Sequence, residues 1–174
     1  IDLTTSLSVE QMKQMFDQNK IRFDDRALKY GCLTISNQKR RFQITSFRKD
    51  IRTFGRAADI ELVENIEEDA KRRDFTINAI YCSHSGQIID PLGNLEDLNK
   101  IKLDFIGDPE CRIKEDYLRI LRFFRFVAVL DLKGENVASN NLPIIKKHIN
   151  GISDLSNERV ASEIRKILLA RSPS

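Results

Sequence analysis

The sequence predicts an α+β fold in which a lobe of strands and short helices is followed by a helical lobe. Two observations predict this order. Residues that alternate between apolar and polar, the pattern of strands, occur before residue 107. After Asp108-Pro109, a pair typical of a helix start, apolar residues recur at helical spacing instead. We therefore expect two parts, residues 1–107 and residues 108–174.

The composition is that of a globular protein. The chain has 174 residues, of which 41% are apolar and 32% charged, enough to bury a core. No apolar run is long enough to span a membrane and no signal peptide is recognisable, so we expect a cytoplasmic protein without a membrane partner. The three cysteines lack paired spacing, which favours free thiols over disulfides or a zinc site. The net charge is only +3, but basic residues cluster locally, and local clusters matter more for nucleic-acid contact.

The elements of the first part follow from local signals. Residues 1–3 predict the end of a strand, and Ser8 with Gln11 fits a capping box that opens a short helix. Residues 32–36 and 41–47 alternate as the two strands of a hairpin. We expect a strand, a helix and then a hairpin.

In the following segment, turn and capping residues predict where helices and strands begin and end. Residues 49–58 are polar, contain a glycine and show no period, so we expect a mobile loop. Asn65 with Glu68 predicts a capped helix that runs towards Ala79. Residues 81–90 predict two short strands around a turn, and Ile101, Leu103 and Phe105 alternate as one more strand.

The segment Arg72-Arg73-Asp74-Phe75-Thr76-Ile77-Asn78-Ala79 collects the polar groups that a nucleotide needs. Arginine offers a planar fork of donors suited to phosphate, and it stays charged. Asp74 can accept a hydrogen bond from a sugar hydroxyl, and Asn78 can both donate and accept. The alternative is an arginine-rich helix end with solvated charges.

A second group of polar residues follows about forty residues later, in Glu115-Asp116-Tyr117-Leu118-Arg119. Asp116 and Arg119 are three apart on a predicted helix, so we expect them on one face. An acceptor beside a donor matches the pairing edges of cytosine and adenine, and it would leave guanine and uracil with unpaired groups. The alternative is an ordinary helical ion pair.

Arg119, Arg122 and Arg125 follow one another at intervals of three residues. Each interval turns an α-helix by about −60°, so the three side chains fan around it and cannot share one stripe. Some must face a groove or another lobe. A triphosphate and an interdomain salt-bridge network both remain open as partners.

Four segments together resemble the class II tRNA nucleotidyltransferases (CCA-adding enzymes) and the related bacterial poly(A) polymerases. They are residues 72–79, 90–93, 115–126 and 155–160, in this order. The resemblance implies a DNA polymerase beta-like nucleotidyltransferase head, incomplete at its N-terminus, followed by a helical neck that selects nucleotides. It also implies template-independent addition of C and A to the 3′ end of tRNA, with ATP and CTP as substrates and Mg²⁺ as cofactor.

The resemblance assigns roles to residues of both segments. Arg73 and Asp74 match residues that hold phosphate and ribose, and Asp116 with Arg119 matches the pair that selects C and A. Glu115 would orient Arg119, Asp90 to Gly93 would serve as a hinge, and Glu158-Arg159 would brace the neck. The expected nucleotide-binding residues are Arg73, Asp74, Asn78, Glu115, Asp116, Arg119, Arg122 and Arg125.

The catalytic signature of the family is incomplete in this sequence. Ile1-Asp2-Leu3-Thr4-Thr5 matches the tail of an Asp-x-Asp strand, so Asp2 would be the one catalytic and metal-binding carboxylate. The first carboxylate would precede Ile1, and neutral Gln43 stands where a further one is usual. We expect a cut sequence, a second chain that supplies the missing parts, or decayed activity.

Three functions therefore remain open on sequence alone: a CCA-adding enzyme, a poly(A) polymerase, and a non-catalytic nucleotide- or RNA-binding partner of a split or decayed enzyme. Because one metal carboxylate is present where two or three are expected, we predict that this chain alone does not add nucleotides at a rate typical of the family.

Overall fold

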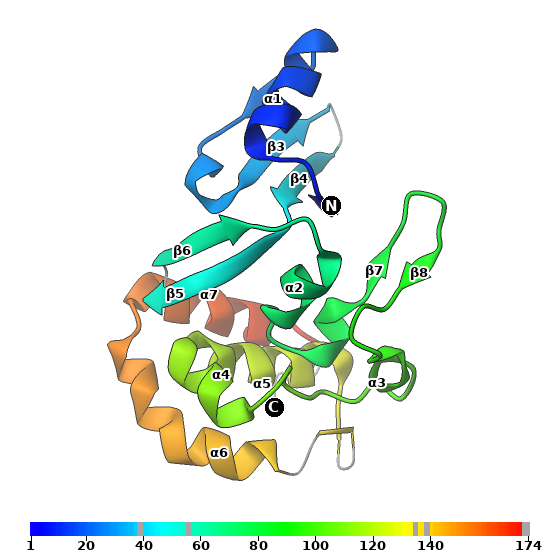
Figure 1. Ribbon diagram of the computed structural model, residues 1–174. Helices are drawn as coiled ribbons and strands as arrows, with labels where there is room; N and C mark the ends of the chain where they lie inside the picture. The colour runs from blue at the N-terminus through cyan, green and yellow to red at the C-terminus, as the bar shows by residue number, and fades with distance from the viewer. Residues whose placement is uncertain (38–39, 55–56, 134–135, 138–139, 172–174) are drawn as a thin grey trace. The chain divides into compact units, whose positions relative to one another are not determined.

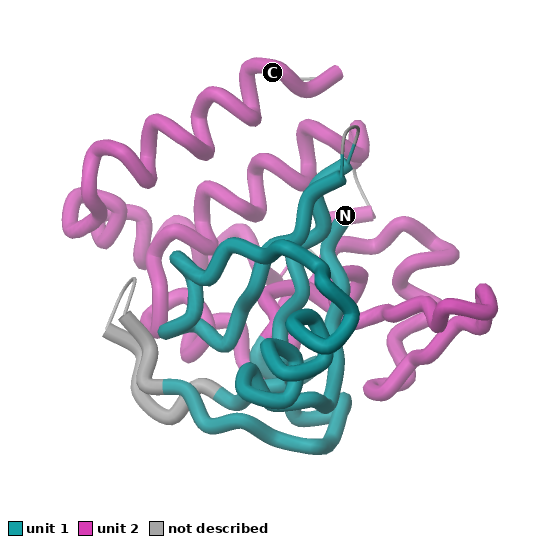
Figure 2. Tube along the Cα trace, turned by 90° about the horizontal axis from the view of Figure 1, so that it is seen from above, with its two compact units in different colours: residues 1–52, 58–72 teal, residues 53–57, 73–174 magenta. Residues whose placement is uncertain are grey.

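The computed structural model describes residues 1–37, 40–54, 57–133, 136–137 and 140–171, without the side chains of 50–54 and 57–59. The chain forms two compact units, coloured separately in Figure 2. The first unit contains residues 1–52 and 58–72, and the second contains residues 53–57 and 73–174. The main change from one unit to the other thus falls after Arg72. The domain division that we expect at residue 107 stays a prediction.

A four-stranded sheet is the frame of the first unit. Its order is β1 (Asp2–Thr5), β4 (Arg41–Ser46), β3 (Cys32–Ser36) and β2 (Phe23–Asp24). β1 runs parallel to β4, whereas β3 is antiparallel to both of its neighbours. The strand at the start of the chain and the hairpin are both confirmed.

Helix α1 (Val9–Gln18) supplies the apolar layer on this sheet. The predicted capping box is present, because the Ser8 hydroxyl accepts from the Gln11 backbone and the Gln11 side chain accepts from the Ser8 backbone. Phe16 and Phe23 place their ring centroids 5.8 Å apart. The buried core of the first unit consists of Val9, Met12, Phe16 and Leu33.

A second pair of strands occupies the segment for which we expected a loop. β5 (Arg48–Phe54) and β6 (Ala57–Leu62) form a two-stranded sheet, and residues 55–56 lie outside the described part. The loop prediction is therefore wrong for residues 49–54 and 57–58. A strand needs a pairing partner for its backbone groups rather than an apolar face, so a polar strand can lack a readable period.

The helix that follows is shorter than predicted. α2 (Ile66–Lys71) does begin after Asn65, which accepts from the Glu67 backbone. It ends well before Ala79, because Phe75 is extended (φ −123°, ψ 150°) and forms a β-bridge with Phe105. The Phe75 ring is fully buried. Long-range packing therefore overrides the helical pattern, and only one 3-10 turn, η2 (Thr76–Ala79), follows.

The next segment contains the predicted hairpin, β7 (Tyr81–Cys82) and β8 (Ile88–Ile89), with an unpredicted short helix α3 (Leu95–Asn99) behind it. A turn hydrogen bond of 3.0 Å from the Gly86 backbone to the Ser83 carbonyl closes the hairpin. The expected strand over residues 101–105 is reduced to two isolated bridges, through Leu103 and Phe105.

The rest of the second unit is helical, as predicted. It contains α4 (Pro109–Glu115), α5 (Leu118–Leu130), α6 (Asn141–His148), the 3-10 segment η4 (Ile149–Asp154) and α7 (Asn157–Leu168), visible in the lower half of Figure 1. The predicted cap of α4 is confirmed, because the Asp108 carboxylate accepts from the Cys111 backbone at 2.7 Å. The break between α4 and α5 was not predicted.

One aromatic core joins the segment after Arg72 to helix α5. The Phe75 ring lies 4.9 Å from that of Phe105 and 6.1 Å from that of Phe123, and the Phe105 and Phe123 rings stack with an interplanar angle of 7°. The buried members of this core are Phe75, Leu103, Phe105, Ile113, Ile120, Phe123, Leu132 and Ile145. The core fixes Asp74, directly before Phe75, relative to α5.

Two smaller features complete the fold. In the first unit, η1 (Leu28–Tyr30) leads into β3 through Gly31, whose φ of 68° suits glycine. A search of the described residues for a helix with the length and apolar character needed to span a membrane finds none.

Candidate functional site

All eight residues expected to bind nucleotide lie in the second unit, whereas Asp2 lies in the first. Arg73, Asp74 and Asn78 belong to the segment that the aromatic core holds against α5. The other five lie on or beside α4 and α5. The second unit can therefore be described as a site by itself.

Asp74 is a buried carboxylate with three donors. Its side chain is 8% exposed, and one oxygen accepts from the Phe75 backbone at 3.1 Å and from the Asn78 amide at 2.8 Å. The other oxygen accepts from Nε of Arg122 on α5. Burial pushes the pKa of Asp74 up, but the charge of Arg122 and these hydrogen bonds outweigh it and hold the pKa below its usual value. Asp74 is thus kept ionised and oriented.

Asp116 occupies the break between α4 and α5. Its backbone is extended (φ −157°, ψ 106°), so our inference that it shares one helix face with Arg119 is wrong. One carboxylate oxygen accepts from the Leu118 backbone at 3.1 Å, at the start of α5. The other accepts from Arg159 on α7 at 2.7 Å. Asp116 is therefore held by a helix end and by a residue 43 positions away.

Arg119 is held by a different partner. Its guanidinium donates to the Glu115 carboxylate and to the Arg112 carbonyl, and the residue is 8% exposed. The simple ion pair between Asp116 and Arg119 is thus replaced by two separate pairs. Glu115 contacts Arg119, as the resemblance implied, and its role in nucleotide selection stays a prediction.

Arg122 and Arg125 diverge as the three-residue step predicted. Arg122 pairs with Asp74, whereas Arg125 pairs with Glu163 of α7 at 3.1 Å and lies over the Phe126 ring at 4.8 Å. Burial, together with the nearby charge of Arg122, lowers the pKa of Arg125. Within the second unit, the three arginines of α5 thus pair with three different carboxylates.

Sequence reasoning missed three residues that support this site. Arg112 donates to the Glu115 carboxylate and to the Arg73 carbonyl, and the i to i+3 spacing to Glu115 was the available signal. Glu163 is 3% exposed, an acid buried on the face that pairs with α5. Gly151 of η4 lies so close to Tyr117 that an added Cβ would come within 2.3 Å of the ring. No local sequence signal indicates this last contact.

Within the described residues, the expected metal site around Asp2 lacks the second carboxylate that a pair of metal ions needs. Asp2 of β1 pairs in register with Gln43 of β4, and across the sheet the same row continues to Thr34 and Asp24. Directly opposed residues in a sheet share one face, so Asp2 meets a neutral amide. In the described part of the chain, no three His, Cys, Asp or Glu side chains gather to hold a metal ion. These residues do not fit a pair of Mg²⁺ ions.

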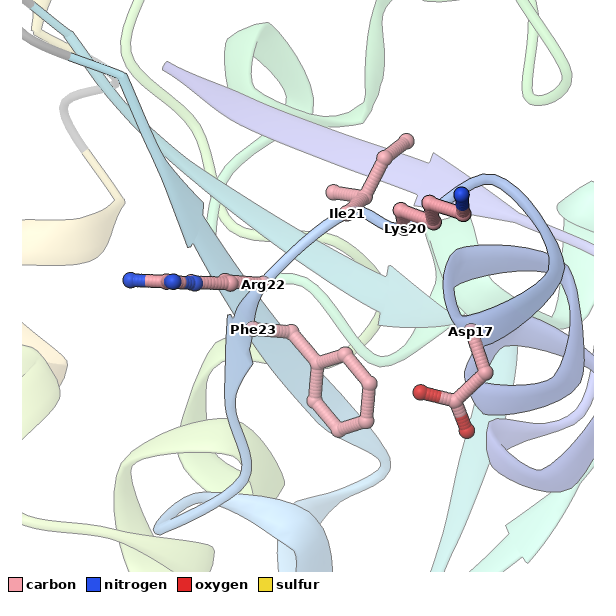
Figure 3. A pocket seen from close by; sticks show the side chains of 5 residues that line it. All are labelled: Asp17, Lys20, Ile21, Arg22 and Phe23. Carbon is pink, nitrogen blue, oxygen red and sulfur yellow. The ribbon is translucent and has the colours of Figure 1, made fainter.

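The first unit also has an open surface pocket at the end of α1, shown in Figure 3. It is lined by Asp17, Lys20, Ile21, Arg22 and Phe23. It contains none of the expected site residues. In Figure 3 the Arg22 and Phe23 side chains leave the chain in opposite directions.

Comparison with known proteins gives consistent results. Residues 1–104 match the family described as poly A polymerase head domain. The human mitochondrial CCA tRNA nucleotidyltransferase 1 is 38% identical over 171 residues, which cover 97% of this chain and 39% of that protein. The CCA-adding enzyme of Streptococcus uberis is 36% identical over 172 residues, covering 98% of this chain and 41% of that enzyme.

A solved structure agrees with these sequences. The crystal structure of the Bacillus stearothermophilus CCA-adding enzyme in complex with CTP aligns with a TM-score of 0.84 and 30% identity, over 98% of this chain and 40% of that one. The expected nucleotidyltransferase head fold is confirmed. The chain spans about two fifths of the length of these curated relatives, 39% and 41%. The chain belongs to the poly A polymerase head domain family, and these relatives are CCA-adding tRNA nucleotidyltransferases.

Proposed function

We propose that this chain is the nucleotide-selecting part of a CCA-adding tRNA nucleotidyltransferase. In the reaction of such an enzyme, the 3′-hydroxyl of tRNA attacks the α-phosphate of CTP or ATP and releases pyrophosphate. The names of the relatives and the CTP in the Bacillus stearothermophilus complex support these substrates. Since the chain spans two fifths of these relatives, the activity of the whole enzyme belongs to the proposal.

The observation that carries the proposal is the separate fixation of Asp116 and Arg119. Asp116 is held by Arg159, and Arg119 by Glu115, so neither neutralises the other. A carboxylate has about four acceptor positions and a guanidinium has five donors, so both keep capacity for a base edge. Groups held in place by other residues need little reorganisation when the base arrives. This arrangement favours an amino donor beside a ring-nitrogen acceptor, as in cytosine and adenine.

The remaining nucleotide contacts follow from the Asp74 cluster. Asp74 is ionised, oriented by Asn78 and able to accept from a ribose hydroxyl through its remaining lone pair. Arg122 gives its Nε to Asp74 while its side chain stays 32% exposed, so its terminal nitrogens can reach a phosphate. We assign Arg73 and Arg125 to the same triphosphate by resemblance.

Magnesium would neutralise phosphate charge in this class of reaction. Asp2 faces Gln43, and the described residues do not supply a metal-binding cluster. We therefore assign to this chain the binding and orientation of the nucleotide. The cytoplasmic location also stays a prediction, since one of the relatives is named as mitochondrial.

Binding of the four nucleoside triphosphates to the purified chain tests this function. We expect a preference for CTP and ATP, which Arg119→Ala should abolish by removing one bidentate base contact. Such a contact contributes about 1–3 kcal/mol, a factor of roughly 5–150. The matched control is Arg165→Ala, the same substitution at an exposed position of α7. Unchanged selectivity in Arg119→Ala would contradict the proposal.

A second candidate is a non-catalytic nucleotide- or RNA-binding partner, which the neutral Gln43 opposite Asp2 favours. Incubation with labelled CTP or ATP, Mg²⁺ and tRNA that lacks its 3′ end separates the two. Nucleotide binding without turnover supports the second candidate. Turnover that appears only in Gln43→Glu would instead support the first candidate, the CCA-adding enzyme. Binding of ATP but not CTP would indicate a poly(A) polymerase instead.

A further inference from the structure

Arg112 of α4 links two parts of the candidate site that lie 39 residues apart in the chain. One end of its guanidinium, Nη1, donates to the Glu115 carboxylate at 2.6 Å. The other end, Nη2, donates to the backbone carbonyl of Arg73. The Arg112 side chain is only 12% exposed. Because a guanidinium is planar and rigid, its two ends fix the distance between the groups that they bind.

The Glu115 end of this link also holds Arg119. The same oxygen of Glu115 accepts from Arg112 and from Nη1 of Arg119. Nη1 of Arg119 donates in addition to the backbone carbonyl of Arg112. Both contacts that Arg119 makes with the described residues leave from this one nitrogen, so Nε and Nη2 keep their donors for a base edge. The direction of these donors therefore depends on where Arg112 and Glu115 hold Nη1.

The Arg73 end of the link fixes the backbone directly before Asp74. The carbonyl of Arg73 accepts from Arg112, and the next carbonyl, that of Asp74, accepts from the Ile106 backbone at 3.2 Å. The Asp74 carboxylate is the group to which we assign the ribose hydroxyl. Groups that bind a ligand must be held within about 0.5 Å of their productive positions. The donor on the Arg73 carbonyl therefore affects how Asp74 meets the ribose.

The charges around Glu115 make this arrangement sensitive to the loss of Arg112. Two guanidinium groups share one carboxylate, so Glu115 cannot neutralise both of them. The Arg119 side chain is 10% exposed, and charges that are screened so little by water interact strongly. Without Arg112, the whole charge of Glu115 would act on Arg119 and draw its guanidinium away from the base edge.

We propose that Arg112 is a positioning residue that couples base selection to ribose recognition. Through Glu115 it holds Arg119, which we assign to the base. Through the Arg73 carbonyl it holds the backbone of Asp74, which we assign to the ribose. One rigid group thus sets the distance between the base-reading end and the ribose-reading end of the site. The inference rests on the proposed function, because it takes these two assignments from it.

Equilibrium binding of CTP, UTP and 2′-deoxy-CTP to the purified chain tests the coupling. The ratio of the CTP and UTP affinities measures base selection, and the ratio of the CTP and 2′-deoxy-CTP affinities measures ribose recognition. We expect Arg112→Ala to lower both ratios, each by about tenfold, as for one charged hydrogen bond that is no longer aligned. Arg119→Ala should lower the base ratio alone, because Arg119 does not hold the Arg73 carbonyl.

Lys114→Ala is the matched control, since Lys114 is a cation of the same helix that pairs with Glu110 and is 53% exposed. It should leave both ratios unchanged. Arg112→Lys keeps the positive charge but replaces the fork by a single nitrogen, so at most one ratio should return to the wild-type value. If urea unfolding shows that Arg112→Ala does not fold, Arg112→Lys decides by itself, because at least one ratio must then fall.

A merely structural role of Arg112 would lower the free energy of unfolding and weaken the three nucleotides equally, so both ratios would stay unchanged. Unchanged ratios, loss of only one ratio in Arg112→Ala, equal losses in Lys114→Ala, or recovery of both ratios in Arg112→Lys would each overturn the inference and leave the proposed function standing. A wild-type chain that prefers CTP over UTP without distinguishing the ribose would do the same. A wild-type chain with no preference for CTP over UTP would instead contradict the proposed function, and the inference with it.

Discussion

The charges of the two units are used in opposite ways. In the first unit, Asp24 pairs with Arg26 at the surface, and Arg22 and Arg41 face solvent. In the second, Asp74 and Glu163 are buried and each holds an arginine of α5. Exposed pairs contribute little because water screens them, whereas a buried charge that loses its partner is costly. An acid that pairs with an arginine thus contributes little to stability at the surface of the first unit and much more in the interior of the second.

The largest expected effect comes from breaking a buried pair. Arg122→Ala leaves the Asp74 carboxylate in the core with only its neutral donors. We expect a loss of roughly 2–4 kcal/mol of unfolding free energy, at or below the usual range for such a change because Arg122 is 32% exposed. Urea unfolding at neutral pH measures it. A second variant that also carries Asp74→Asn should recover part of the loss, and no recovery would show that the pair is not the cause.

A smaller effect is expected at the break between α4 and α5. In Gly151→Ala, the new Cβ would lie 2.3 Å from the Tyr117 ring, so the ring or η4 must move. We expect about 1–3 kcal/mol of destabilisation from this overpacking. Because Tyr117 follows Asp116, the preference for CTP and ATP should also weaken.

Gly86→Ala serves as the control for this substitution. An added Cβ there meets no atom within 4 Å, although its φ of +85° also strains alanine. Its cost should therefore be confined to stability. Full nucleotide preference in Gly151→Ala would show that Tyr117 does not position Asp116.

How much of this could be predicted from sequence depends on the range of the interaction. The caps at Ser8 and Asp108 were predicted correctly because the donor and the acceptor lie three residues apart. The break at Asp116 was not, because Arg159 and the Tyr117–Gly151 contact act over longer distances in the chain. The pattern over residues 109–130 is helical throughout, and only tertiary contacts show where it is interrupted.

The geometry of the candidate site could be predicted only where helical rotation alone decides it, and the roles of its residues stay a prediction. The three arginines of α5 were expected to fan outwards, and they do, since helical rotation alone decides it. The shared helix face of Asp116 and Arg119 was wrong because sequence spacing cannot show that the helix breaks at Asp116, where Arg159 of α7 binds. The loop expected at 49–58 failed for a related reason, because the pairing of β5 with β6 is not encoded in either strand's period.

The smallest expected effect is a difference in how stability depends on pH at the buried Asp74 and at the surface Asp24. The pKa of Asp74 in the folded chain lies below its ordinary value of about 3.9, so the unfolded chain takes up the proton first as the pH falls. The stability that Asp74 contributes is therefore complete above about pH 5 and lost as the pH falls through the folded pKa. Asp74→Asn should lose less stability than the wild type between pH 6 and pH 3.

Asp24→Asn is the matched substitution at the exposed pair. The pKa of Asp24 is also low, about 2, chiefly through Arg26, but this pair lies at the surface, with the Arg26 side chain 85% exposed. Its effect on acid unfolding should be smaller and should decrease at about 1 M salt, where the screening length falls to roughly 3 Å. The effect of Asp74→Asn should persist there, because burial limits screening. Urea unfolding at each pH, at low and high salt, measures both variants. If the two variants lose the same unfolding free energy as the pH falls and respond equally to salt, the contrast between a buried and an exposed ion pair does not hold in this chain.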